Sequence, residues 1–253
     1  MEYAIIIYSD GDKMIKHIND VDVNYIDYGK GDAVVLLHGW GQNIEMMKPV
    51  GDRLNCRKII VDLPGYGLSS EPSYVWSVYD YVECIHELLN YLNIKKPILI
   101  GHSFGGKISL VYASCYEVKK LILFASPFKK GVEKLSLKTK ILKKAKKVPI
   151  LNKLEEFAKK HIGSTDYKNA SVMMRKILVE TVNLDIRKDV KNIKCPTLIF
   201  WGTNDSAVPF QDAYELEELI EDSGVVMYEG CSHYAYLEML PQVIKTIKIF
   251  LEG

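Results

Sequence analysis

The sequence has almost no net charge and no long apolar run, and each absence excludes a class of protein. Its 33 lysines and arginines nearly balance 32 aspartates and glutamates, giving a formal net charge of +1, which argues against a dedicated nucleic-acid binder. No stretch approaches the roughly 20 apolar residues needed to span a bilayer. We therefore expect no nucleic-acid partner and no stable membrane insertion.

Paired cysteines and a secretion signal are also missing. The five cysteines are odd in number, widely spaced and without a C-x-x-C pair, so we expect reduced thiols rather than a disulfide framework or a metal site. They are Cys56, Cys84, Cys115, Cys195 and Cys231. The N-terminal stretch MEYAIIIYSDGDK lacks a basic n-region and a small-residue cleavage site, so we expect a cytoplasmic protein.

What the chain does contain is an alternation of short apolar runs with segments of helical period. The apolar runs end in Gly, Asp, Ser or Pro and predict strands within 21–29, 33–39, 57–65, 95–103, 119–127 and 196–205. The helical segments are 77–94, 104–117, 210–221 and 241–252. Such alternation predicts a mostly parallel sheet with helices on both faces, and functional residues at the carboxyl ends of its strands.

One segment, 127–192, contains no good strand and predicts a helical cap inserted into the α/β core of residues 1–126 and 193–253. Helices are expected at 135–147 and 150–162. Such an insertion commonly shapes a substrate pocket. Between Lys129 and His161 the segment has 12 lysines and 3 glutamates. We interpret them as a solvated helix face, and attraction for an anionic substrate, an acyl carrier or a membrane surface stays open as the alternative.

The stretch ILIGHSFGGKISL (98–110) places Ser103 between glycines, directly after a buried strand and before a helix. So sharp a turn forces its central residue to a positive φ and requires small neighbours, which Gly101 and Gly105 supply. Ser103 would project at the sheet edge with the amide of Phe104 beside it. We therefore predict that Ser103 is a nucleophile.

A serine nucleophile needs a base and a group that orients the base. Of the six histidines, His233 follows the strand-like run VVMYEGCS and precedes the last helix, which places it on a loop at the same edge. Asp205 follows the strand PTLIFWG and would orient His233. Asp62 also ends a strand, but we interpret it as a residue that shapes a turn.

A second amide is needed beside Phe104 to stabilise an oxyanion. The strand predicted within 33–39 runs into His-Gly-Trp-Gly, and the amide of Trp40 is the best candidate. The Trp40 ring could also line a pocket, since the two roles use different atoms.

Together these strings resemble the α/β-hydrolase fold superfamily over nearly the whole chain. The matching motifs are HGWG (38–41), DLPGYGLS (62–69), GHSFGG (101–106), WGTND (201–205) and CSHYAYLE (231–238). The resemblance implies an eight-stranded, mostly parallel sheet, a cap after the sixth strand, and no cofactor. It also implies a triad of Ser103, Asp205 and His233. A small departure is the pair Met239-Leu240 before Pro241.

Within that superfamily, epoxide hydrolases and haloalkane dehalogenases resemble this pattern but carry Asp at the nucleophile position, so Ser103 argues against both. We predict a serine hydrolase that cleaves a small-molecule carboxylic ester through an acyl-enzyme. The alternatives are a thioesterase, a carbon–carbon bond hydrolase or a non-catalytic ligand-binding protein. The predicted pocket residues are Trp40, Phe128, Met173 and Met174. No oligomeric state is predicted.

Overall fold

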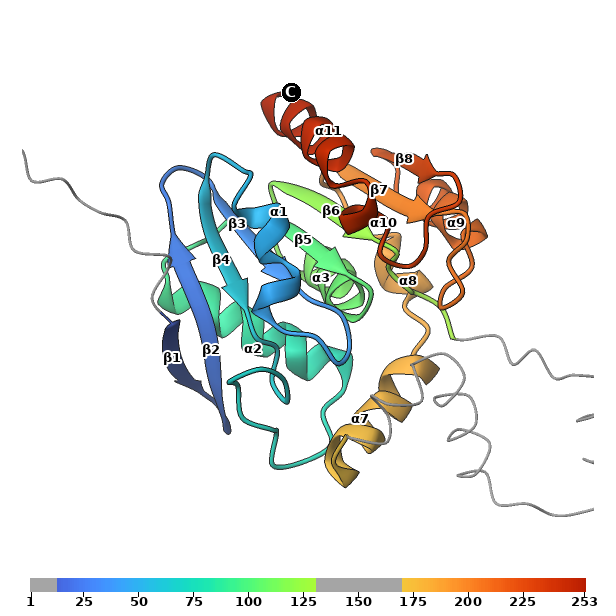
Figure 1. Ribbon diagram of the computed structural model, residues 1–253. Coiled ribbons are helices and arrows are strands. Elements are labelled where there is room, and N and C mark those ends of the chain that lie inside the picture. The colour runs from blue at the N-terminus through green and yellow to red at the C-terminus, as the bar shows by residue number, and fades with distance from the viewer. Residues whose placement is uncertain (1–12, 131–169) are drawn as a thin grey trace, which may run out of the picture.

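The computed structural model describes residues 13–130 and 170–253. An eight-stranded sheet in the order β1-β2-β4-β3-β5-β6-β7-β8 forms its centre (Figure 1). The strands are β1 Lys13–Ile18, β2 Val21–Tyr28, β3 Ala33–Leu37, β4 Arg57–Val61, β5 Ile98–His102, β6 Lys120–Phe124, β7 Thr197–Gly202 and β8 Ser223–Tyr228. β1 and β2 pair antiparallel, as do β2 and β4, whereas every other neighbouring pair is parallel.

The helices cover both faces of this sheet. They are η1 Ile44–Met46, α1 Lys48–Gly51, α2 Val78–Tyr91, α3 Phe104–Cys115, α7 Val172–Asn183, α8 Arg187–Val190, α9 Gln211–Leu219, α10 Ala235–Glu238 and α11 Leu240–Glu252. The predicted helices at 135–147 and 150–162 lie outside the described residues. The predicted α/β-hydrolase fold with a mostly parallel eight-stranded sheet is confirmed, while the bounds of the cap stay a prediction.

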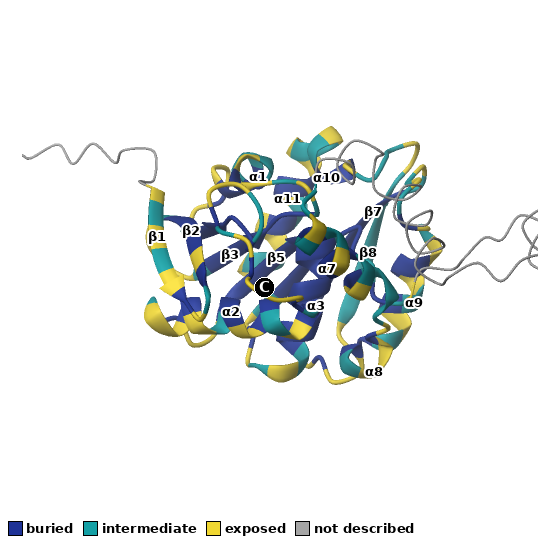
Figure 2. Cartoon of the chain, turned by 90° about the horizontal axis from the view of Figure 1, so that it is seen from below, coloured by how far each residue is buried: buried dark blue, intermediate teal, exposed yellow. Residues whose placement is uncertain are grey.

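The central strands β3, β5, β6 and β7 are mostly apolar and buried at nearly every position, so both faces of the sheet are covered there. In β3, Val35 and Leu37 belong to a core with α2 and α3, whereas Val34 and Leu36 belong to a second core with α1 and α11. Since side chains alternate along a strand, this division shows helices packing on each face. Figure 2 shows the central strands in dark blue and the edge strand β1 mostly in teal and yellow.

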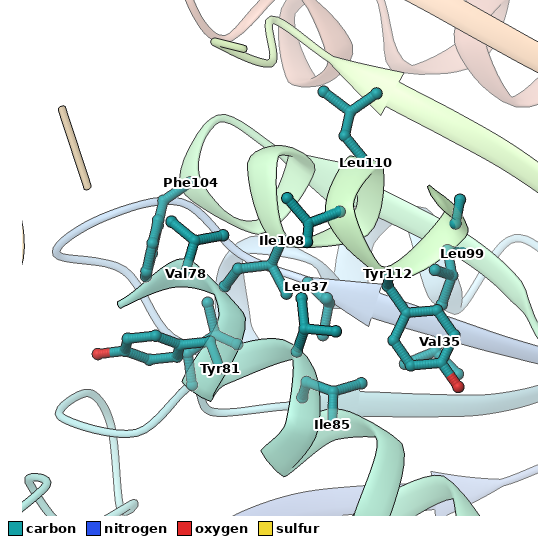
Figure 3. Close-up of a cluster of buried hydrophobic side chains, with 14 of the residues drawn as sticks. Val35, Leu37, Val78, Tyr81, Ile85, Leu99, Phe104, Ile108, Leu110 and Tyr112 are labelled. Carbon is teal, nitrogen blue, oxygen red and sulfur yellow. The ribbon is translucent and has the colours of Figure 1, made fainter. Parts of the chain in front are cut away.

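The core between the sheet and helices α2 and α3 fixes the helix that follows Ser103. Figure 3 shows Ile108 of α3 and Ile85 of α2 among the side chains that pack with Leu37. Helix α2 begins with a capping box, in which the Ser77 hydroxyl accepts the Asp80 N–H and the Asp80 carboxylate accepts the Ser77 N–H. Local capping and burial thus agree on where α2 begins.

Candidate active site

Ser103 lies on the strained turn between β5 and α3. Its backbone has φ 50° and ψ −111°, outside the regions that non-glycine residues normally occupy. The turn is fixed on both sides, because the Ser103 N–H donates to Phe124 O at 2.9 Å and the Lys107 N–H donates to Ser103 O at 2.9 Å. The predicted positive φ at Ser103 is confirmed.

The turn depends on glycines because strand and helix approach closely. A Cβ at Gly101 would lie 2.5 Å from Gly105 O, and one at Gly105 would lie 2.3 Å from Leu37 O. The Gly105 N–H donates to His38 O at 3.0 Å, which ties the start of α3 to the loop after β3. Any larger residue at either glycine would push the two elements apart.

Asp205 and His233 meet on the loops that follow β7 and β8. Asp205 Oδ2 lies 2.7 Å from His233 Nδ1, and the Asp205 side chain is fully buried while that of His233 is 14% exposed. The other carboxylate oxygen, Oδ1, accepts the N–H groups of Ala207 and Val208 at 2.8 and 2.9 Å. This arrangement orients the carboxylate and places the His233 proton on Nδ1, which leaves Nε2 as an acceptor.

The loop of His233 lies against the residue that precedes Ser103. His102 Nε2 is 3.1 Å from His233 O, and the two imidazole rings are 4.8 Å apart. Among the described residues, Ser103 Oγ makes no hydrogen bond to His233. The structure therefore joins His233 to Asp205 and brings their loops to the turn of Ser103, without a closed Ser103–His233 contact.

The loop after β3 is ordered by buried His38. His38 Nδ1 lies 2.7 Å from Gly39 O, and His38 Nε2 accepts the N–H of Leu63 at 3.0 Å. Because Nε2 is an acceptor, the His38 proton is on Nδ1 and donates to Gly39 O. Burial lowers the pKa of His38 to about 4, so the ring remains neutral at pH 7.

The Gly39–Trp40 peptide is held in one orientation. The Gln42 N–H also donates to Gly39 O, at 3.3 Å, and Gln42 Oε1 accepts the Gly39 N–H at 2.9 Å. Since the carbonyl and amide of one peptide point in opposite directions, the Trp40 N–H points away from these groups. The amides of Trp40 and Phe104 have no hydrogen-bond partner in the described part of the chain, and their rings lie 5.3 Å apart.

Asp62 connects three segments of the same edge. Its Oδ1 accepts the Ile44 N–H at 2.8 Å, and its Oδ2 accepts from Asn24 Nδ2 at 2.7 Å and from the Leu68 N–H at 2.9 Å. The side chain is buried and its acceptor capacity is used within the fold. These contacts agree with the interpretation of Asp62 as a structural residue.

The predicted pocket residues lie at different depths. Trp40 and Met173 are partly buried, Met174 is almost enclosed, and Phe128 is fully enclosed in the core. Met174 packs against the loop after β4, where a Cβ at Gly65 would lie 2.4 Å from its Sδ. Figure 1 shows α7, which carries both methionines, on the side to which the central strands point. Their role in substrate binding stays a prediction.

Two residues at this edge, His102 and Lys107, are not indicated by any sequence motif beyond their place beside Ser103. Lys107 is 1% exposed, and its Nζ donates to Thr181 O at 2.7 Å and Leu184 O at 2.6 Å, at the end of α7. Burial lowers the pKa of Lys107 to about 8. Its partners lie more than 70 residues away along the chain, so no local pattern indicates this contact.

Over residues 13–130 and 170–253, no cluster of His, Cys, Asp and Glu has the arrangement of a metal site. In the same ranges, none of the helices has both the length and the apolar character of a membrane span.

Comparison with known proteins identifies the family to which this fold belongs. A family model described as the alpha/beta hydrolase fold matches residues 32–136. The chain is 31% identical over 252 residues to the AB hydrolase superfamily protein YisY of Bacillus subtilis, covering 88% of this chain and 93% of that protein. The chain therefore belongs to the α/β-hydrolase superfamily.

Two further relatives are esterases. The pimeloyl-[acyl-carrier protein] methyl ester esterase of Aliivibrio fischeri is 27% identical, over 88% of this chain and 95% of that protein. The solved esterase EaEST of Exiguobacterium antarcticum superposes with a TM-score of 0.75 at 25% identity, covering 96% of this chain and all of that chain. Membership of a hydrolase family with esterases among its members is thus established for this chain.

Proposed function

We propose that this protein is a serine hydrolase that cleaves small-molecule carboxylic esters through an acyl-enzyme. The observation that carries the proposal is Ser103 at φ 50°, on a turn near the amides of Phe104 and Trp40, which have no partner among residues 13–130 and 170–253. A nucleophile beside two free N–H donors is the arrangement that acyl transfer requires. Esterases among the relatives, such as those of Aliivibrio fischeri and Exiguobacterium antarcticum, support an ester as the substrate.

In the first half-reaction, Ser103 Oγ attacks the ester carbonyl carbon while His233 Nε2 takes the proton of the Ser103 hydroxyl. Asp205 retains the proton on Nδ1 and stabilises the imidazolium that forms. The carbonyl electrons move to oxygen, and the amides of Trp40 and Phe104 donate to this oxyanion. When the carbonyl re-forms, the alkoxide leaves, takes the proton from His233 and departs as the alcohol.

In the second half-reaction, water replaces the alcohol. His233 Nε2 takes a proton from the water as its oxygen attacks the acyl carbon. The second oxyanion uses the same two amides, and its collapse breaks the bond to Ser103 Oγ. Ser103 recovers its proton from His233, and the carboxylic acid leaves. The scheme requires no cofactor.

The acyl or alcohol group would lie between the loop of Trp40 and helix α7. Leu178 of α7 packs against Trp40, so the helix borders the loop after β3. Met173 and Met174 are on the same helix. Flexible thioether side chains adapt to substrates of different shape, and Phe128 would close the base of this pocket.

A chain-length series of p-nitrophenyl esters tests the proposal, with wild type, Ser103→Ala and a matched control, Ser114→Ala, in helix α3. We expect hydrolysis by wild type and by Ser114→Ala, and a loss of about 10⁴-fold or more with Ser103→Ala. Full activity in Ser103→Ala would refute the assignment of the nucleophile. Failure of wild type to hydrolyse any ester of the series would refute the proposed function.

A further inference from the structure

His102 lies at the end of β5 with its ring between two loops of the site. The side chain is fully buried. Its Nε2 is 3.1 Å from the backbone oxygen of His233, and its Nδ1 is 3.2 Å from Gln42 Oε1. One imidazole thus contacts the loop of the proposed base and the loop of the proposed oxyanion site, and each ring nitrogen faces an oxygen.

A neutral imidazole has one N–H and one lone pair, so only one of these contacts can be a hydrogen bond. Gln42 Oε1 already accepts the Gly39 N–H at 2.9 Å. Turning the Gln42 side-chain amide over would place its NH₂ group against the Gly39 N–H, so Oε1 stays on this side. The carbonyl of His233 has no other donor in the described part of the chain. Because leaving this partly buried carbonyl without a donor is costly, the proton of His102 belongs on Nε2.

The surroundings keep the ring neutral. The rings nearest to it are those of His233 at 4.8 Å, Tyr234 at 5.5 Å and Tyr236 at 4.8 Å, an imidazole and two phenols. Burial, together with His233, lowers the pKa of His102 well below its usual range, and His38 acts in the same direction. No described carboxylate contacts the ring. A doubly protonated His102, which could satisfy both oxygens, is therefore disfavoured.

We propose that His102 is a positioning residue whose Nε2–H holds the carbonyl of His233 and so fixes the loop of the base against the turn of Ser103. The inference rests on the proposed function, because it names what positions the base of that reaction. Asp205 restrains the His233 side chain at Nδ1, whereas His102 restrains its main chain. When both the side chain and the main chain of His233 are held, the direction of its Nε2 is set. When only the Asp205 contact remains, the His233 ring can move relative to Ser103 Oγ.

Two substitutions separate this role from general packing. In His102→Gln the side-chain amide reaches about as far as Nε2, so an N–H donor remains for the His233 carbonyl. In His102→Asn the amide ends near the position of Nδ1 and cannot reach that carbonyl. Both variants remove the ring, so a role in packing alone would affect them alike.

The two variants are compared by kcat and KM for an ester and by the rate at which a fluorophosphonate probe labels Ser103. We expect His102→Asn to lose about 10- to 100-fold in kcat and in labelling rate, because small displacements of a catalytic group have effects of this size. His102→Gln should stay within about threefold of wild type, and KM should change less than about twofold in both. Equal losses in both variants, or losses confined to KM, would overturn the proposal.

A ¹⁵N NMR measurement on the wild-type protein tests the hydrogen bond without any substrate. We expect the His102 ring to be neutral at pH 7 with its proton on Nε2, and a proton on Nδ1 or a doubly protonated ring would overturn the proposal. Labelling by the fluorophosphonate probe also separates the positioning role of His102 from the proposed ester hydrolysis. If Ser103 is labelled and the variants differ as expected while no ester is turned over, the ester assignment fails and the positioning role stands.

Discussion

Lys107 gives the fold a pH dependence that can be measured as stability. It is buried in α3, and its ammonium group donates to the carbonyls of Thr181 and Leu184 at the end of α7. Cations favour helix C-termini, yet enclosure in the core penalises the charged form. The informative perturbation is Lys107→Met, which keeps most of the length of the side chain and removes the charge.

The size of the effect follows from the pKa of Lys107, which burial lowers from the usual 10.5 to about 8. A difference of about 2.5 pKa units corresponds to about 3.4 kcal/mol between the two protonation states. From about pH 8 to about pH 10.5 the unfolded chain binds more protons at this site than the folded protein. The free energy of unfolding therefore rises with pH across that window, and burial of the charge is most costly below pH 8.

The assay is urea unfolding of wild type and Lys107→Met at pH 7.5 and pH 9.5. The other titrating groups are common to both proteins and cancel in the comparison. We expect wild type to gain about 2 kcal/mol relative to the Met variant between these two pH values. A difference that is constant with pH, or that falls as pH rises, would refute the assignment of a desolvated ammonium at this position.

Three further predictions concern the turn at Ser103, the orienting acid Asp205 and the lysine-rich segment 129–161. Gly105→Ala should destabilise the fold by about 3 kcal/mol, because its Cβ would lie 2.3 Å from Leu37 O; an unchanged melting temperature would contradict the close approach. Asp205→Asn should stay folded by circular dichroism but lose about 10⁴-fold in kcat, and a loss below about tenfold would exclude Asp205 as the orienting acid. If the lysines of 129–161 are a solvated face, ester hydrolysis should depend on salt equally for anionic and neutral esters; a selective loss for anionic esters would favour substrate attraction instead.

The sequence predicts this fold well where local signals and burial agree. Uninterrupted apolar runs such as that of β5, followed by a small-residue turn and an apolar helix, define the element, its direction and the position of Ser103. The capping box at Ser77 similarly marks the start of α2. Strand β1 was not among the strands predicted from the residues. Its sequence KMIKHI is half polar and largely exposed, and it becomes a strand by pairing with β2 at the sheet edge.

The contacts of the site were less predictable because they join distant parts of the chain. His102 lies 131 residues from the His233 carbonyl that it contacts. The positions of Asp205 and His233 at strand ends suggested that they meet, since parallel strands end at one edge. The direction of the His102 ring and the enclosure of Lys107 depend on side-chain packing, which no pattern in the sequence encodes locally.

The most direct test of the central claim is to isolate the acyl-enzyme. Wild-type protein turning over a p-nitrophenyl ester is quenched in acid, digested and analysed by mass spectrometry. The account predicts the acyl group on Ser103, in the peptide that contains GHSFGG, and no such adduct in Ser103→Ala. An acyl group on another residue during turnover, or turnover by a protein whose Ser103 never carries the acyl group, would contradict the account.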